Sequence, residues 1–490
     1  MLKSHRDIYV RAALIGAALL CVRLISGDFG PGSHTANQPY LLFVGALIFA
    51  GAVWFSFLPL IKKMQTKAVN GRLLLIIFTL GLAARALFFG STPIYEDDWN
   101  RYLWDGYVAA QNENPYIHSP ENIRLAGAAS AQSLSQDIPE SLQKLSRLSQ
   151  QNGDFARRIN SPQYTTIYPP VAVAVFTAAA YIGPLNLDVL RIVFWLCEAL
   201  TLFLMMKALT AYGRSPLWMT LYALNPLIIY AGMNAAHMDV LLLPALLGAL
   251  ITIKSRPFIS AVLLSLAAAI KIWPLLLAPL YYRHWIRRPA IYIGAALMIA
   301  ALSLLLLWPL LSALGEASGT SAYAATWQRS TYLYPLIDEF IGKLTGYWSA
   351  PARLLIAAIC IGLSLWLGFK PVINQWSRDK LIDNLPRHLL LVTLVFFLLS
   401  PTGFPWYLIW LFAFLPFAPR YSAAMLTVLL PIYYVRYALG EQNIYAVYTD
   451  WLVPLQFAIP LGLLLLELTR GEWRAGFAFA PSNERPSHEP

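Results

Sequence analysis

Three consecutive carboxylates, Glu96, Asp97 and Asp98, directly follow an apolar run that could cross a membrane. The chain around them is 58% hydrophobic and only 12% charged. Ionisable groups placed against a membrane segment are costly and usually mark a functional site. These three acids are therefore the first candidates for chemistry.

The residues that follow would share one face of a helix. If DWNRYLWD begins a helix, Asp98, Arg101, Tyr102 and Asp105 stand at i, i+3, i+4 and i+7. Asp97 or Asp98 would then be the N-cap, where the helix dipole lowers the proton affinity of a carboxylate. The alternative is an ordinary interfacial helix, in which the aromatic side chains form a belt and the acids are solvated.

The composition requires a membrane setting for this segment. With 490 residues, a mean hydropathy of +0.55 and 16 Trp, the chain is too apolar for a soluble globular protein. We expect an all-α polytopic membrane protein with about 13 transmembrane or re-entrant helices. The net charge of +11 belongs to the loops of such a protein and indicates no nucleic-acid partner. The three cysteines lie in apolar runs, so we expect no disulfide framework and no zinc site.

Basic residues predict which loops face the cytoplasm. Lys3 and Arg6 precede the first apolar run, and Lys62, Lys63 and Arg72 stand between the second and the third. By the positive-inside rule these segments are cytoplasmic, so the third span emerges outside. Residues 91–165 then form a large extracytoplasmic loop, and residues 314–350 form a second one.

We expect residues 1–470 to form one transmembrane domain, followed by a polar, disordered cytoplasmic tail over residues 471–490. Several apolar segments after residue 170 are shorter than the roughly 20 residues that a full crossing needs. Broken helices are tolerated at membrane depth only where they are buried in protein or line a wet cavity. The short segments therefore predict helices that are buried in protein or that line a wet cavity.

Polar residues also stand between apolar runs further along the chain. His237 and Asp239 separate two such runs, and Lys271 precedes a Trp-Pro pair. Ionisable residues at membrane depth mark functional sites. The structural alternatives are a hydrogen-bonded core histidine and a lysine that reaches the headgroups. Trp406 and Tyr407 follow a Pro-containing turn, and as an isolated feature such a pair is more typical of an interfacial anchor.

Taken together, these segments resemble a known family. YEDDWNRYLWDGYVAAQNENPY, YTTIYPP, ALNPLIIYAGMNAAHMD, AAAIKIWPLLLAPL and SPTGFPWY, spread over about residues 80–410, resemble the GT-C integral-membrane glycosyltransferases. Within that class they resemble the polyprenyl-phosphate-mannose-dependent mannosyltransferases, which include bacterial enzymes of the glycosyltransferase 87 type. The acidic pair followed by RYLWDG and NPY is the most specific part. In that family the two acids often form a D-x-D motif, whereas in this chain they are adjacent and follow Glu96.

The resemblance implies transfer of a hexose, with mannose as the family's suggestion, from a polyprenyl-phosphate donor to a glycan or glycolipid acceptor. The reaction would take place on the extracytoplasmic face of the inner, or plasma, membrane. The resemblance makes Asp97 or Asp98 the base, and direct displacement by one base would invert the anomeric centre. Whether Mg²⁺ or Mn²⁺ is needed stays open, with Asp97 and Asp98 as the residues that a metal would contact.

The phosphate that leaves needs cations, and Arg101, Lys271 and Arg329 are candidates. The turn Asn114–Tyr116 is expected to shape the cleft. The full set assigned to substrate binding is Glu96, Arg101, Tyr102, Asp105, Asn114, Tyr116, Tyr168, His237, Asp239, Lys271, Arg329, Trp406 and Tyr407.

Two other classes of function fit the same residues. A transporter or flippase of a lipid-linked sugar would also use broken helices and intramembrane charges such as Lys271. A scaffold of envelope assembly would leave the acids merely solvated.

Overall fold

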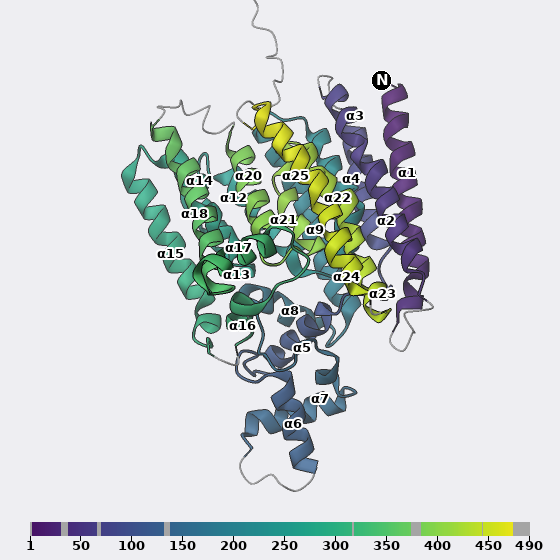
Figure 1. Ribbon diagram of the computed structural model, residues 1–490, viewed down its shortest axis with the longest axis vertical. Helices are drawn as coiled ribbons and strands as arrows, with labels where there is room; N and C mark the ends of the chain where they lie inside the picture. The colour runs from purple at the N-terminus through teal and green to yellow at the C-terminus, as the bar shows by residue number, and fades with distance from the viewer. Residues whose placement is uncertain are drawn as a thin grey trace, which may run out of the picture.

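The computed structural model describes residues 2–30, 38–65, 70–131, 138–315, 318–373, 384–442 and 444–473. Within these ranges the fold is helical, and its only β-type pairing is an isolated bridge between Arg329 and Thr402. Figure 1 shows the helices gathered into one bundle, with α6 and α7 projecting from the end opposite the N-terminus. The predicted tail lies outside the described residues from residue 474 onward.

Seven helical stretches in the described residues are long and apolar enough to cross a membrane, or up to eight if one bent pair counts as a span. The protein is therefore a multi-pass membrane protein. The stretches are built on α1 (Leu2–Ile25), α2 (Tyr40–Phe55) with α3 (Phe57–Met64), α9 (Leu187–Ala211), α15 (Pro289–Leu311), α18 (Ala350–Ile373), α22 (Tyr421–Leu429) with α23 (Val435–Glu441), and α24 (Tyr445–Val447) with α25 (Val453–Thr469).

Shorter helices fill the space between these spans. They are α4 (Gly71–Ala86), α8 (Pro170–Ile182), α10 (Thr220–Ala223), α11 (Pro226–Ile229), η5 (Tyr230–Asn234), η6 (Met238–Leu241), α12 (Leu242–Thr252), α13 (Pro257–Ile270), α14 (Ala278–Tyr282), α20 (Leu385–Leu399) and α21 (Leu408–Phe412). The helices of the two predicted outer loops are α5 (Asp98–Ala110), α6 (Pro120–Ala131), α7 (Glu140–Gln151), α16 (Gly319–Thr326) and α17 (Leu333–Thr345).

The expected number of about 13 spans is not confirmed. Many apolar runs after residue 170 form helices too short to cross a membrane alone, and prolines begin several of them. One pair, Pro226–Asn234 and Met238–Thr252, bends by 103° at its break. This bend places His237 at the junction of two half-helices.

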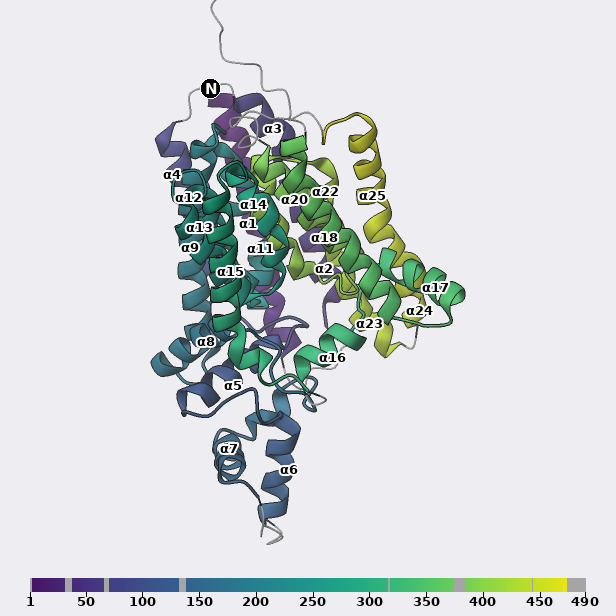
Figure 2. The same cartoon turned by 90° about the vertical axis from the view of Figure 1, so that its left-hand side faces the viewer.

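The two ends of the bundle differ as the charge pattern suggests. The N-terminus, the end of α3 with Lys62 and Lys63, and the end of α25 lie at one end in Figure 1. Helices α5 to α7 lie at the other end, and α16 lies there as well in Figure 2. The first outer loop and the basic segments thus lie at opposite ends of the bundle.

A buried ion pair ties three segments together inside the bundle. The Nε atom of Arg85 on α4 lies 2.9 Å from Glu198 Oε2 on α9, and both side chains are buried. Tyr222 on α10 donates its hydroxyl to Glu198 Oε1, and Arg85 also donates to the carbonyl of Ala223. Each polar group is thereby satisfied at a depth where no water can replace the partner.

A second polar network joins the start of the first outer loop to the bent pair. Asn234 accepts a hydrogen bond from the amide of Ile94 and donates to Ser91 and to the Thr92 carbonyl. Arg191 on α9 donates to the carbonyls of Ser91, Met233 and Asn234. This network satisfies irregular backbone inside the protein and fixes the loop against the bend.

Helix α5 packs against α8 at unusually short range because of a glycine. A Cβ atom at Gly106 would meet the carbonyl carbon and oxygen of Phe176 at 2.5 Å. Only glycine allows two helix backbones to approach this closely. The packing holds the helix that carries Asp98 against the bundle.

We therefore expect Gly106→Ala to destabilise the fold by about 1–3 kcal/mol, because the added methyl group must displace backbone. Gly45→Ala is the matched control, since no atom lies within 4 Å of a Cβ built at Gly45 in α2. Thermal unfolding of the purified proteins in detergent compares the two. Equal melting temperatures for both variants would contradict the close approach of α5 and α8.

Candidate active site

The three acids lie where the first outer loop meets the bundle. Glu96 is buried, Asp97 is exposed at the position before α5, and Asp98 is the first residue of α5 with a side chain 26% exposed. The φ angle of 61° at Tyr95 turns the chain sharply just before them. The acids therefore point to different surroundings although they are adjacent in sequence.

Asn160 holds two of the acids together. Its side-chain nitrogen donates to Asp97 Oδ1 at 2.7 Å and to Asp98 Oδ1 at 3.0 Å. One amide group thus reduces the repulsion between neighbouring carboxylates. The Asp98 Oδ2 atom faces away from Asn160, toward His237.

The expectation that the helix N-terminus lowers the proton affinity of the acids is wrong. Burial and the neighbouring charge of Asp97 together raise the pKa of Asp98 to about 6, while Asn160 and Lys271 oppose the shift. Partial loss of water around its carboxylate also raises the pKa of Asp97, whose side chain makes no capping hydrogen bond. Loss of water outweighs the helix dipole here, because the acids are partly enclosed and repel each other.

Glu96 is the most enclosed of the three acids. Burial raises its pKa well above the usual value, and the charges of Asp98 and Asp97 add to this effect. The positive charge of Arg436 opposes the shift. The Tyr434 hydroxyl opposes the shift as well. The net effect favours the protonated form of Glu96.

The His237 ring lies between two of these acids. Its Nε2 atom is 3.7 Å from Glu96 Oε2, and its Nδ1 atom is 3.8 Å from Asp98 Oδ2. The side chain is 0% exposed, and neither ring nitrogen makes a hydrogen bond. One face of the ring stacks on Trp406, with the ring centroids 3.9 Å apart and 9° between the planes. The indole thus fixes the plane of the imidazole.

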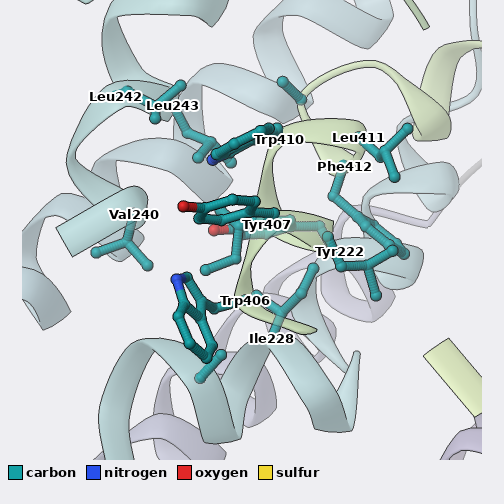
Figure 3. Close-up of a cluster of buried hydrophobic side chains, with 14 of the residues drawn as sticks. Tyr222, Ile228, Val240, Leu242, Leu243, Trp406, Tyr407, Trp410, Leu411 and Phe412 are labelled. Atoms are coloured by element: carbon teal, nitrogen blue, oxygen red, sulfur yellow. The ribbon is translucent and has the colours of Figure 1, made fainter. Parts of the chain in front are cut away.

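Lys271 and Asp239 form a second charged group nearby. Lys271 Nζ lies 2.6 Å from Asp239 Oδ1, and the lysine side chain is 24% exposed. The ammonium group also lies over the rings of Tyr407 and Trp410 at 4.2 and 4.8 Å. In Figure 3 the Tyr407 hydroxyl and both indole nitrogens, of Trp406 and Trp410, point toward the segment that carries Val240. Trp410 completes this arrangement by donating its indole N–H to Asp239.

Arg101 supports the acids through the segment that carries Asn160. Its guanidinium donates to the carbonyls of Asn160, Ser161 and Tyr164. The φ angle of Ser161 is 46°, so a tight turn follows Asn160. Arg101 therefore positions the residue that binds Asp97 and Asp98.

The other predicted residues of α5 are buried within the protein. Tyr102 stacks on Phe176 of α8 and meets Tyr168 edge to face. Burial raises the pKa of Asp105 to about 6, an effect that Arg101 and Thr166 oppose. Of the four residues predicted to share one face of the helix, only Asp98 lies close to His237.

The side chains of the Asn114–Tyr116 turn make hydrogen bonds to backbone groups. The Asn114 side chain accepts from the amide of Tyr116, and the Tyr116 hydroxyl donates to the carbonyl of Tyr168. This turn therefore joins the end of the first outer loop to its beginning.

Arg329 lies in the second outer loop and has an exposed side chain. Its backbone pairs with Pro401 and Gly403, which ties the second loop to the turn before Trp406. Tyr323 of the same loop shares a hydrogen bond with the Tyr407 hydroxyl at 2.8 Å. The second loop thus contacts the aromatic side of the site.

Comparison with known protein families decides the class of protein. Residues 166–401 match the model of glycosyltransferase family 87. Over this region the chain is similar to glycosyltransferase family 87. The protein is therefore a glycosyltransferase, and the transporter and scaffold alternatives give way to an enzyme that takes a sugar donor and an acceptor. No curated protein matches the chain.

The family 87 region contains only part of the candidate site. Tyr168, His237, Asp239, Lys271 and Arg329 lie within it, whereas the three acids precede it and Trp406 follows it. The candidate site is assembled across the boundaries of the match. The two parts meet where the Nδ1 atom of His237 lies 3.8 Å from the Oδ2 atom of Asp98.

Sequence reasoning missed several residues of this glycosyltransferase. Asn160 stands in the segment INSPQY without a periodic pattern, and only its placement beside Asp97 reveals its role. Trp410 follows Tyr407 by three residues, a spacing that places both on one side of a helical turn. That spacing could have added Trp410 to the site.

The described residues include no group of three or more His, Cys, Asp or Glu side chains placed to hold a metal ion. Asn160 donates to one oxygen of each of the two aspartates. Whether transfer requires Mg²⁺ or Mn²⁺ stays open.

The pair formed by Lys271 and Asp239 should be coupled energetically. Lys271→Met leaves the buried Asp239 carboxylate without its cation and should cost about 3 kcal/mol. Combining it with Asp239→Asn should restore part of that loss, because the amide carries no charge and still accepts the Trp410 N–H. Thermal unfolding of the two single variants and the double variant measures the coupling. Purely additive shifts would show that the two groups do not depend on each other.

Proposed function

We propose that this glycosyltransferase transfers mannose from a polyprenyl-phosphate donor to a glycan or glycolipid acceptor on the extracytoplasmic face of the plasma membrane. The observation that carries the proposal is the approach of Asp98 to His237 and of Lys271 to Asp239 at one end of the bundle. An acid able to take a proton and a cation able to meet a phosphate then lie close enough for the charge of Lys271 to act on Asp98. This combination suits displacement of a phosphate by a hydroxyl group.

Asp98 is the better base of the two aspartates. Its Oδ1 atom is held by Asn160, its Oδ2 atom faces His237, and its side chain keeps a quarter of its surface exposed. A pKa of about 6, raised by burial, leaves Asp98 ionised at neutral pH and still basic enough to take a proton. Asp97 is exposed and lies on the outer side of the Asn160 amide.

In the proposed reaction the acceptor hydroxyl attacks the anomeric carbon as Asp98 removes its proton. The bond between that carbon and the phosphate oxygen breaks at the same time, which inverts the anomeric centre. The polyprenyl phosphate leaves with an added negative charge. Lys271 is the proposed partner of that charge, since the guanidinium of Arg101 already donates to three carbonyls.

A donor that arrives from the lipid fits the surroundings of Lys271. The lysine is partly exposed, and the next residue, Ile272, has 41% of its surface exposed. A cation beside an exposed apolar side chain suits a phosphate joined to a polyprenyl chain. The placement of α5 to α7 opposite the basic loops supports an extracytoplasmic site.

Asp98→Asn should lower the rate of transfer by about 10³-fold, because the amide cannot take the proton. Asp97→Asn should lower it by less than about tenfold. The measurement is transfer of radiolabel from polyprenyl-phosphate mannose to membrane acceptors, with polyprenyl-phosphate glucose as the competing donor. Unchanged melting temperatures confirm that both variants fold.

A wild-type protein that uses the glucose donor and rejects the mannose donor would overturn the assignment of the sugar. Loss of transfer in Asp97→Asn with retention in Asp98→Asn would instead reverse the assignment of the base.

The rate should also depend on pH through Asp98. Because the base must be ionised, transfer should fall as the pH drops below about 6, the value to which burial raises the pKa of Asp98. The charge of Asp97 contributes to that raised pKa, so Asp97→Asn should move the acidic limb to lower pH. Profiles of kcat against pH for the two proteins test this direction. A limb that stays in place or moves upward would show that Asp97 does not act on the base.

A further inference from the structure

His237 is buried in a position where both ring nitrogens lack hydrogen-bond partners, which is rare for buried polar atoms in folded proteins. The two nearest acceptors are carboxyl oxygens on opposite sides of the ring, Glu96 Oε2 at 3.7 Å and Asp98 Oδ2 at 3.8 Å. The ring therefore lies between the two acids, and no helix cap or backbone group uses its nitrogens.

The position of the His237 ring is fixed by stacking and by its backbone. His237 stacks on Trp406, and Phe404 stacks on the other face of that indole at 4.3 Å. The backbone amide of His237 donates to Ala231, and the preceding Ala236 takes a φ of 55°, an unusual value for a residue with a side chain. Shortening each gap to about 2.9 Å requires the carboxyl groups to move by less than about 1 Å.

The charges around the ring decide which protons it carries. A neutral ring between two carboxyl groups needs a hydrogen-bond donor at one nitrogen, and Glu96, with a side chain 6% exposed against 26% for Asp98, is the more enclosed acid and the one that keeps its proton to donate. A neutral imidazole accepts at one nitrogen and donates from the other. Glu96 can then donate a hydrogen bond to Nε2, and Asp98 can accept one from Nδ1.

We propose that His237 is a positioning residue, which accepts a hydrogen bond from protonated Glu96 at Nε2 and donates from Nδ1 to Asp98 Oδ2. This chain orients the catalytic carboxylate from the side opposite Asn160. Asp98 is then held at both carboxylate oxygens, at Oδ1 by Asn160 and at Oδ2 by His237. The catalytic consequence rests on the proposed function, while the hydrogen-bond chain itself is a property of the protein without substrate.

The hydrogen-bond chain is tested first without substrate. In protein labelled with ¹⁵N-histidine, the His237 signals are assigned by their loss in His237→Gln, and the ¹⁵N shifts report which nitrogen carries the proton. We expect the neutral Nδ1–H tautomer in the wild type and in Glu96→Gln, whose amide still donates. Glu96→Met should lose this preference. An imidazolium, or the Nε2–H tautomer, in the wild type at neutral pH would overturn the proposal.

Kinetics tests the positioning role in the same proteins. The side-chain amide of Asn reaches the place of Nδ1, and that of Gln reaches the place of Nε2, so His237→Asn should retain more activity than His237→Gln. We expect about a hundredfold loss of kcat in His237→Gln, with little change in the KM for the donor. Glu96→Gln should stay within about threefold of wild type, and Glu96→Met should lose at least tenfold.

The outcomes distinguish failure of the hydrogen-bond chain from failure of the proposed function. Glu96→Gln as inactive as Glu96→Met would overturn the donor role of Glu96 even if Asp98→Asn is inactive. A wild type with the Nδ1–H tautomer and no transfer of mannose would remove the proposed function and leave the hydrogen-bond chain standing. Glu339→Gln is the control for loss of an acid, since Glu339 is exposed on α17 of the second outer loop and pairs with Lys343.

Discussion

The site depends on the network that joins Asn234 and Arg191 to the start of the first outer loop. A bent pair of half-helices leaves backbone amides and carbonyls without helical partners, and inside a membrane protein each must find a partner within the chain. Asn234 and Arg191 supply those partners and use the same bonds to hold residues 91–94. The constraint that makes the bend possible therefore also sets the distance between the acids and His237.

A second principle of the site is the use of aromatic rings in place of polar contacts. Trp406 restrains His237 by stacking, and Tyr407 and Trp410 lie beneath the ammonium group of Lys271. Such contacts hold a charged or polar group without occupying all of its hydrogen-bonding atoms. The nitrogens of the imidazole and part of the ammonium stay available, while the position of both groups is fixed.

Much of the site could be predicted from the sequence because its residues break a simple rule. Charged residues such as Asp98, Asp239 and Lys271 are conspicuous in an apolar chain, and each lies in the cluster. Membrane spans with continuous apolar runs, such as α1 and α15, were equally predictable. The number of spans was not, because short helices such as α8 and α13 have the composition of a span without its length.

Other features depend on contacts between distant segments, which composition does not encode. The direction of the pKa shift at Asp98 follows from burial and from Asp97, and the helix dipole alone gave the wrong sign. The role of Arg101 could not be predicted either, because its partners are backbone carbonyls of residues 160–164. Asn160 illustrates the same limit, since an amide in a polar loop carries no signal of its own.

The division of the site at the edges of the family 87 region has a consequence for recognising such enzymes. A pattern confined to residues 166–401 includes His237 and Lys271 but none of the three acids. Under the proposed function, a chain could satisfy that pattern and lack the base, so similarity to the family and catalytic competence are separate questions. Catalytic competence would then be judged from the few residues after the third apolar run, where an inactive copy of the enzyme would first differ.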